Sequence, residues 1–197
     1  MIKRMKRIIL LFVSIILTSM SSFAYDGVFN GVMIIGSDDK DFDIKTTDGI
    51  SGTLNYNIEL YTDGINKQYC LRVAFDESKR FMMIPTYGTI LLKTKKDEVI
   101  ELKALYSYDE TEGDKLGYSY FPISEEQLAK ITKDVVVKFR IQMIAENDHH
   151  KTFGDKEWKI DQFSFFVEKM VAEVDKQWEK KKKSFTAATQ NDIRAGF

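Results

Sequence analysis

Four tyrosines with alternate spacing are the strongest candidates for a binding surface in this sequence. Tyr106 and Tyr108 end one predicted strand, and Tyr118 and Tyr120 lie on the next. Alternate residues of a strand point to the same side, so a hairpin with its turn at 109–115 would place all four rings on one face. Such a face could bind a glycan or a protein partner through ring stacking and outward hydroxyl groups. The plainer alternative is that the rings form cross-strand pairs that stabilise the sheet.

Three aspartates at alternate positions could offer oxygen ligands to a calcium ion. Asp39, Asp41 and Asp43 have the spacing with which a calcium loop begins. The rest of the loop does not follow, because Ile44 replaces the glycine of the sharp turn and Ile50 replaces the bidentate glutamate. We therefore expect a solvated, acidic strand start with the carboxylates on its outward face.

The two histidines of the chain are adjacent and follow two carboxylates. Glu146, Asp148, His149 and His150 are acceptable zinc ligands by type, but their order matches no metal motif. Neighbouring strand residues point to opposite faces, so the two histidines would share a metal only if a loop bent them together. A polar turn before Lys151 is the favoured interpretation, and no metal site is predicted.

Cys70 is the single cysteine, so a disulfide within the chain is impossible. In a strand it would share a face with Arg72 and Ala74, and a thiol packed in a sheet without an activating base behaves as a small apolar group. The sequence also has no nucleophile elbow, phosphate loop or dinucleotide fingerprint. We predict no catalytic residue and no cofactor, and the chain is not expected to be an enzyme.

The elements that must position these residues are mainly strands. Alternation is clearest at 53–61 and 68–75, and the turn-like composition between them predicts an antiparallel hairpin. About nine short strands at this spacing are typical of a β-sandwich or a barrel. The other predicted strands are 28–35, 42–47, 80–84, 89–94, 98–108, 116–121 and 134–143.

Two helices interrupt this pattern. Ser124 and Gln127 fit a capping box, which predicts a short connector helix whose Leu128 and Ile131 face inward. A longer amphipathic helix is predicted at about 161–183, followed by a short tail, and its polar end carries a run of lysines. Its apolar stripe must be covered, either by the sheet of the same domain or by a partner or membrane surface.

The first 24 residues have the features of a signal peptide. A basic start precedes a ten-residue apolar run, and small residues at Ser22 and Ala24 predict cleavage before Tyr25. An uncleaved anchor is the alternative. Cleavage would remove four basic residues and leave 25 Lys and Arg against 30 Asp and Glu, a formal charge of −5 that argues against a nucleic-acid binder. We expect an exported protein, periplasmic or secreted, without a transmembrane segment in the mature chain.

Five segments together resemble a group of small exported proteins of Gram-negative bacteria, whose function is not characterised. They are GTILLKTKKDEVIEL at 88–102, YFPISEEQL at 120–128, VKFRI at 137–141, EWKID at 157–161 and DIRAGF at 192–197. The resemblance implies a β-sandwich or barrel-like domain in a bacterial protein. It carries no known active site.

These observations favour one β-rich domain over residues 25–197. The expected fold is an antiparallel β-sandwich with a connector helix and a C-terminal amphipathic helix, and the alternative is a lipocalin-like barrel. The first functional hypothesis is a non-catalytic binding or interaction module for a protein or glycan partner. The alternatives are a barrel that carries a small apolar ligand and a hydrolase with a carboxylate and histidine site. The oligomeric state stays open.

Overall fold

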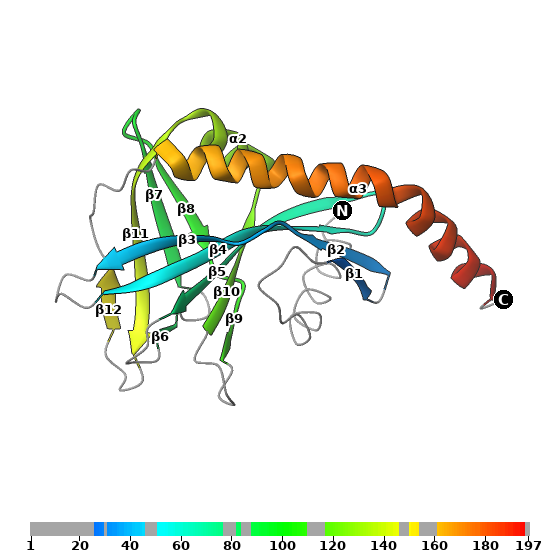
Figure 1. Cartoon of the computed structure of the whole chain (residues 1–197), viewed down its shortest axis with the longest axis horizontal. Helices are drawn as coiled ribbons and strands as arrows, with labels where there is room; N and C mark the ends of the chain where they lie inside the picture. The colour runs from blue at the N-terminus through cyan, green and yellow to red at the C-terminus, as the bar shows by residue number, and fades with distance from the viewer. Residues whose placement is uncertain are drawn as a thin grey trace.

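In a computed structural model, the described part of the chain folds into two antiparallel sheets and two helices (Figure 1). The structure describes residues 26–29, 31–45, 51–76, 82–83, 88–109, 117–145, 150–153 and 161–195. Within them the fold is mainly β and sandwich-like, with a C-terminal helix, as the alternation of apolar residues predicts. The described strands form two separate sheets, which departs from the lipocalin-like barrel that was the alternative.

The larger sheet has seven strands. Its order is β1 (Asp26–Phe29), β2 (Val32–Gly36), β4 (Ser51–Thr62), β5 (Lys67–Asp76), β10 (Gly117–Ile123) and β9 (Tyr106–Asp109), and β3 (Lys40–Lys45) also pairs with β4. β2 and β3 follow one another along the same edge of β4, because Gly36 pairs with Glu59 and Lys40 pairs with Tyr56. The predicted hairpin of β4 and β5 is confirmed.

The smaller sheet has five strands. Its order is β12 (His150–Phe153), β11 (Val136–Ala145), β7 (Thr89–Thr94) and β8 (Val99–Lys103), and β6 (Met82–Met83) pairs with β11. Most predicted strands therefore exist within a few residues of their expected bounds. β12 was not expected, because the sequence around His150 was interpreted as a polar turn.

Two predicted strands are wrong because each is two strands. The segment 28–35 turns at Gly31, whose φ of 76° is accessible to glycine without strain, so it forms the β1–β2 hairpin. The segment 98–108 passes from the smaller sheet to the larger one at Ala104 and Leu105. There the N–H of Leu105 donates to the carbonyl of Tyr120 at 2.8 Å, which begins the pairing of β9 with β10.

One hydrophobic cluster fills the space between the sheets and the helices. The larger sheet contributes alternate residues such as Ile58 and Leu71, and the smaller sheet contributes Leu92 and Leu102. The apolar stripe of the long helix completes the cluster with Phe163, Val167, Met170, Val174, Trp178 and Phe185. The expectation that this stripe packs on the domain's own sheets is therefore confirmed.

The short helix α2 (Glu125–Lys133) begins with the predicted capping box. Ser124 accepts from the N–H of Gln127 at 3.1 Å, and the Gln127 side chain accepts from the N–H of Ser124 at 2.9 Å. These bonds satisfy two of the donors that a helix start leaves open. Ile131 is buried in the core, as expected.

The long helix α3 (Asp161–Ala195) starts at the predicted residue but continues twelve residues beyond 183. The lysine run does not end it, because lysine is a good helix former and Phe185 follows Trp178 by seven residues on the same stripe. The two rings meet edge to face at 5.8 Å. In Figure 1, α3 lies along the outside of the sheets and its C-terminal end extends past β1 and β2.

Candidate functional site

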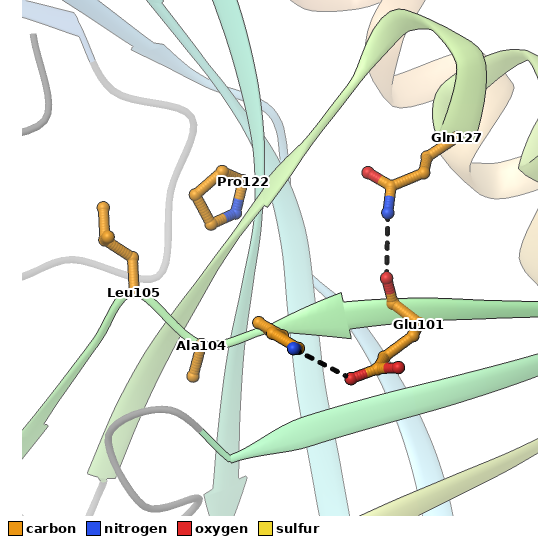
Figure 2. A pocket seen from close by; sticks show the side chains of 6 residues that line it. Glu101, Ala104, Leu105, Pro122 and Gln127 are labelled. Carbon is orange, nitrogen blue, oxygen red and sulfur yellow. Dashed lines mark hydrogen bonds and ion pairs between the residues drawn. The ribbon is translucent and has the colours of Figure 1, made fainter. Parts of the chain in front are cut away.

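A pocket of about 500 Å³ opens where the two sheets meet (Figure 2). It lies between the end of β8, the connection to β9, the end of β10 and the first turn of α2. We call it the seam pocket. Its lining divides into an apolar wall, made of Ala104, Leu105 and Pro122, and a polar wall, made of Glu101, Lys103 and Gln127.

Hydrogen bonds hold the polar wall in place. The Gln127 amide nitrogen donates to the backbone carbonyl of Glu101 at 2.8 Å (Figure 2). The oxygen of the same amide accepts from the N–H of Ser124. The Lys103 ammonium lies 3.5 Å from the Glu101 carboxylate. Gln127 is thus fixed at both ends, whereas the two charged side chains are about half to three-quarters exposed, at 49% and 72%, and can turn toward a ligand.

The free edge of β8 forms one side of the seam pocket. The N–H of Ala104 donates to the carbonyl of Gly88, so the alternate residues Glu101 and Lys103 direct their backbone groups away from β7. The Glu101 carbonyl is already occupied by Gln127, and charged residues on an edge strand disfavour the addition of another strand. The pocket therefore suits a small ligand better than an extended peptide.

The predicted tyrosine hairpin adjoins the seam pocket. Its pairing is as expected, since Tyr118 pairs with Tyr108 and Tyr120 pairs with Tyr106. The Tyr120 side chain is 2% exposed, so its ring is in the interior and not on an exposed platform. The side chains of Tyr106, Tyr108 and Tyr118 lie outside the described part, and ligand binding by these three residues stays a prediction.

A second group of charged and polar side chains lies on the face of the larger sheet that is opposite the hydrophobic core. We call it the charge cluster: Asp39, Glu59, Tyr61 and Arg72. The Arg72 guanidinium lies 3.6 Å from the Asp39 carboxylate and 3.9 Å from the Glu59 carboxylate. The Tyr61 hydroxyl donates to Glu59. Glu59 and Arg72 are 0% and 2% exposed, so their charges must be compensated inside the protein, and each contributes to the compensation of the other.

The outward, solvated position expected for the three aspartates is wrong for Asp39. Burial raises the pKa of its carboxyl, although the Arg72 guanidinium acts in the opposite direction. Asp41 and Asp43 are exposed, as expected, and Asp41 accepts a hydrogen bond from the Asn55 amide at 2.8 Å. The described residues contain no group of three acidic, histidine or cysteine side chains that could hold a metal ion.

Cys70 neighbours the charge cluster and is a buried free thiol, as predicted. Burial, and secondarily Glu59, raises the pKa of this thiol well above its usual value, which keeps the thiol protonated and unreactive. The candidate zinc ligands cannot be placed in this way, because 146–149 and the His150 side chain lie outside the described residues.

The sequence contained a partial signal for each of the two sites that were missed. Glu59 and Arg72 occupy the polar face of two strands whose alternation was recognised, but alternation alone does not show that a polar face is buried. For the seam pocket, the capping box identified Gln127, yet its contact with Glu101 joins residues 26 positions apart.

No protein-family model, curated protein or solved structure matches the chain. Neither of the helices in the described residues combines the length and the apolar character that crossing a membrane requires. The site must therefore be interpreted from its own geometry.

Proposed function

We propose that this protein is an exported, non-catalytic binding module and that the seam pocket is its ligand site. The observation that carries the proposal is the division of a pocket of about 500 Å³ into an apolar wall and a polar wall. Ligand pockets of proteins have volumes of roughly 300–1,000 Å³ and combine apolar surface with a few polar groups that fix orientation. Export is supported by the basic start, apolar run and small residues of positions 1–24.

The walls favour a small amphipathic ligand. Leu105 and Pro122 offer apolar surface to a hydrocarbon or ring. On the opposite side, Lys103 can donate hydrogen bonds and Glu101 can accept them. A head group that accepts hydrogen bonds can therefore bind Lys103, and one that donates them can bind Glu101. The ligand we propose thus has an apolar body of about one octyl chain in size and one polar head group.

Binding is favoured over catalysis by the positions of the charged groups. A reaction needs an accessible acid, base or nucleophile in a site that positions the substrate. In the described residues, the two buried charged side chains, Glu59 and Arg72, are in the charge cluster, on the opposite face of the larger sheet from the core. The Glu101 and Lys103 side chains of the pocket pair with each other at an exposed position.

The tyrosine hairpin can extend the same binding surface. Leu105 lies at the base of this hairpin, because its N–H donates to Tyr120 and the next residue is Tyr106. A ligand held in the seam pocket would therefore lie beside strand β9, which carries Tyr106 and Tyr108. The protein or glycan partner predicted for the tyrosines and the small ligand of the pocket would then share one surface of the molecule.

The test uses three amphiphiles that share an octyl chain and differ in the head group: octanoate, octylammonium and octyl glucoside. Each is titrated below its micelle concentration, and saturation-transfer NMR measures the dissociation constant. We expect at least one to bind the wild-type protein with a dissociation constant below about 1 mM. Leu105→Asp should weaken that binding at least tenfold, since a charged group on the apolar wall removes the favourable burial of the chain, about 0.8 kcal/mol for each CH₂.

Val99→Asp is the matched control, because Val99 is an apolar residue on β8, the strand just before Leu105, is 60% exposed and does not line the pocket. This variant should bind as the wild type does. The proposal is wrong if none of the amphiphiles binds, or if both substitutions weaken binding equally. The proposal also states that the protein is exported. Mass spectrometry of protein exported by a bacterial host tests this part, and the expected mature chain starts at Tyr25.

A further inference from the structure

The outward face of α3 carries a row of four lysines, with one glutamate, Glu173, among them. Lys169, Lys176, Lys180 and Lys183 are all exposed and follow one another at intervals of seven, four and three residues. At 3.6 residues per turn these intervals keep them within about 60° of one another around the helix, over a length of about 21 Å. We call them the lysine row.

The lysine row is opposite the stripe that packs on the sheets. Lys176 and Lys180 lie roughly half a turn of the helix from the buried Val174 and Trp178. In Figure 1 this helix runs along the outside of the molecule, so its outward face is available along the whole row. A flat surface could contact all four ammonium groups at once.

Glu173 lies between Lys169 and Lys176, where its carboxylate accepts a hydrogen bond from the Gln177 amide at 3.3 Å. The other nearby acidic residues of α3 lie beside the lysine row. Glu168 and Glu179 are on its flank, and the Glu179 carboxylate pairs with Lys182 outside the row. Within the described residues, no ion pair involves Lys176, Lys180 or Lys183. The chain as a whole has a formal charge of −1, so the positive potential of the row is a local feature and not a result of excess basic residues.

An aromatic residue stands at the N-terminal end of the lysine row. Phe165 is 47% exposed, and the Lys169 ammonium lies over its ring, 4.2 Å from the centroid. Its position four residues before Lys169 places the ring on the same side of the helix. An aromatic ring next to a row of ammonium groups is the combination with which interfacial helices bind anionic lipid, because the ring enters the apolar boundary while lysines attract head groups.

We propose that the lysine row and Phe165 attach this protein peripherally to a membrane surface rich in anionic phospholipid. The attachment does not use the seam pocket and does not rest on the proposed function. A soluble polyanion could also attract the lysines, but it offers no apolar layer to an exposed phenyl ring. An anionic membrane can therefore bind both the lysine row and the exposed Phe165 ring, whereas a soluble polyanion can bind only the lysines.

Vesicle flotation tests the proposal, with vesicles of phosphatidylcholine alone and of phosphatidylcholine with 30% phosphatidylglycerol. We expect at least fivefold more protein on the anionic vesicles than on the neutral ones, and release in 0.5 M NaCl, because salt screens exposed charges. The triple variant Lys176→Gln, Lys180→Gln, Lys183→Gln should lose at least fivefold of the binding. Phe165→Ala should lose about twofold to threefold.

The matched control, Lys95→Gln, Lys96→Gln, Lys133→Gln, makes the same change of charge at exposed lysines outside the row and should bind as the wild type does. All variants retain the same N-terminal segment, so differences between them isolate α3. Circular dichroism verifies their folding. The proposal is overturned if the wild type ignores anionic vesicles, if both triple variants bind equally, or if Phe165→Ala has no effect while soluble polyphosphate binds the lysine row.

Discussion

The Tyr69 hydroxyl donates a hydrogen bond to the Asp175 carboxylate at 2.7 Å and thereby ties the long helix α3 to strand β5 of the larger sheet. The same carboxylate lies 2.6 Å from the Lys67 ammonium. Burial and then the Asp175 carboxylate raise the pKa of Tyr69, which favours the protonated hydroxyl that donates this bond. One acidic side chain thus joins two residues of β5 to a helix that supplies a large part of the core.

Replacement of Asp175 by alanine should lower the free energy of unfolding by about 1–2 kcal/mol. A hydrogen bond to a charged acceptor contributes about 1.5–3 kcal/mol, and partial exposure of Asp175 and Lys67 reduces that value. Urea denaturation measures the change. Glu168→Ala, an exposed position on the same helix, should change stability by less than about 0.5 kcal/mol. A cycle with Tyr69→Phe should give a coupling energy above about 0.5 kcal/mol, and strict additivity would contradict the expected bond.

Removal of the Arg72 charge should be far more costly than removal of an exposed arginine. Arg72→Met removes a cation that lies 3.9 Å from the buried Glu59 carboxylate and should cost about 3–5 kcal/mol in urea denaturation. Arg140→Met changes an exposed residue on β11 and should cost less than about 1 kcal/mol. Glu59→Gln removes the buried negative charge, so the double variant with Arg72→Met should lose less stability than the sum of the two single variants. Additive losses would show that the two charges are independent.

The Cys70 thiol should react with Ellman's reagent at least a hundredfold more slowly in the native protein than in urea. The thiol is buried, and its raised pKa leaves little thiolate at pH 8. In the unfolded chain the thiol ionises above about pH 8.5, while the native thiol stays protonated. The native state then binds more protons, so stability should fall by about 1 kcal/mol from pH 8.5 to 9.5 through this group.

Cys70→Ala should remove that part of the pH dependence. The measurement is the slope of the unfolding free energy between pH 8.5 and 9.5, compared for the variant and the wild type. Equal slopes would show that burial of the thiol is not the cause.

Alanine at Gly64 should destabilise the protein more than alanine at Gly31. Both glycines have a positive φ, 91° and 76°, which costs a residue with a side chain about 1–2 kcal/mol. At Gly64 the added Cβ would also approach the Phe185 ring to 3.3 Å, whereas at Gly31 it meets no described atom within 4 Å. Thermal denaturation should therefore show a loss that is about 1 kcal/mol larger for Gly64→Ala. Equal losses would mean that Phe185 moves aside without cost.

Local patterns were sufficient to predict the elements whose partners are close in sequence. The β4–β5 hairpin follows from alternation on both sides of a turn-like segment, and α2 follows from Ser124 and Gln127. The stripe of α3 required a cover, and the two sheets provide it. In each case the residues that decide the structure are fewer than about twelve positions apart or belong to one periodic pattern.

The passage between sheets and both sites were beyond such patterns. Apolar residues alternate with polar ones through the end of β8, at Ile100, Leu102 and Ala104. This local pattern does not show that the chain changes its pairing partner from β7 to β10 at Leu105. The seam pocket depends on that change. Burial of Glu59 likewise depends on what covers the second face of the larger sheet, which is a property of the whole fold.

The position of α3 in the chain determines when the fold can form. This helix follows both sheets in the sequence, yet Phe163, Trp178 and Phe185 complete the core. A nascent chain that ends before residue 161 has two sheets whose inner apolar faces lack their cover, so it cannot reach the stable structure. The two sheets should therefore not reach their stable packing until residues 161–185 have been added.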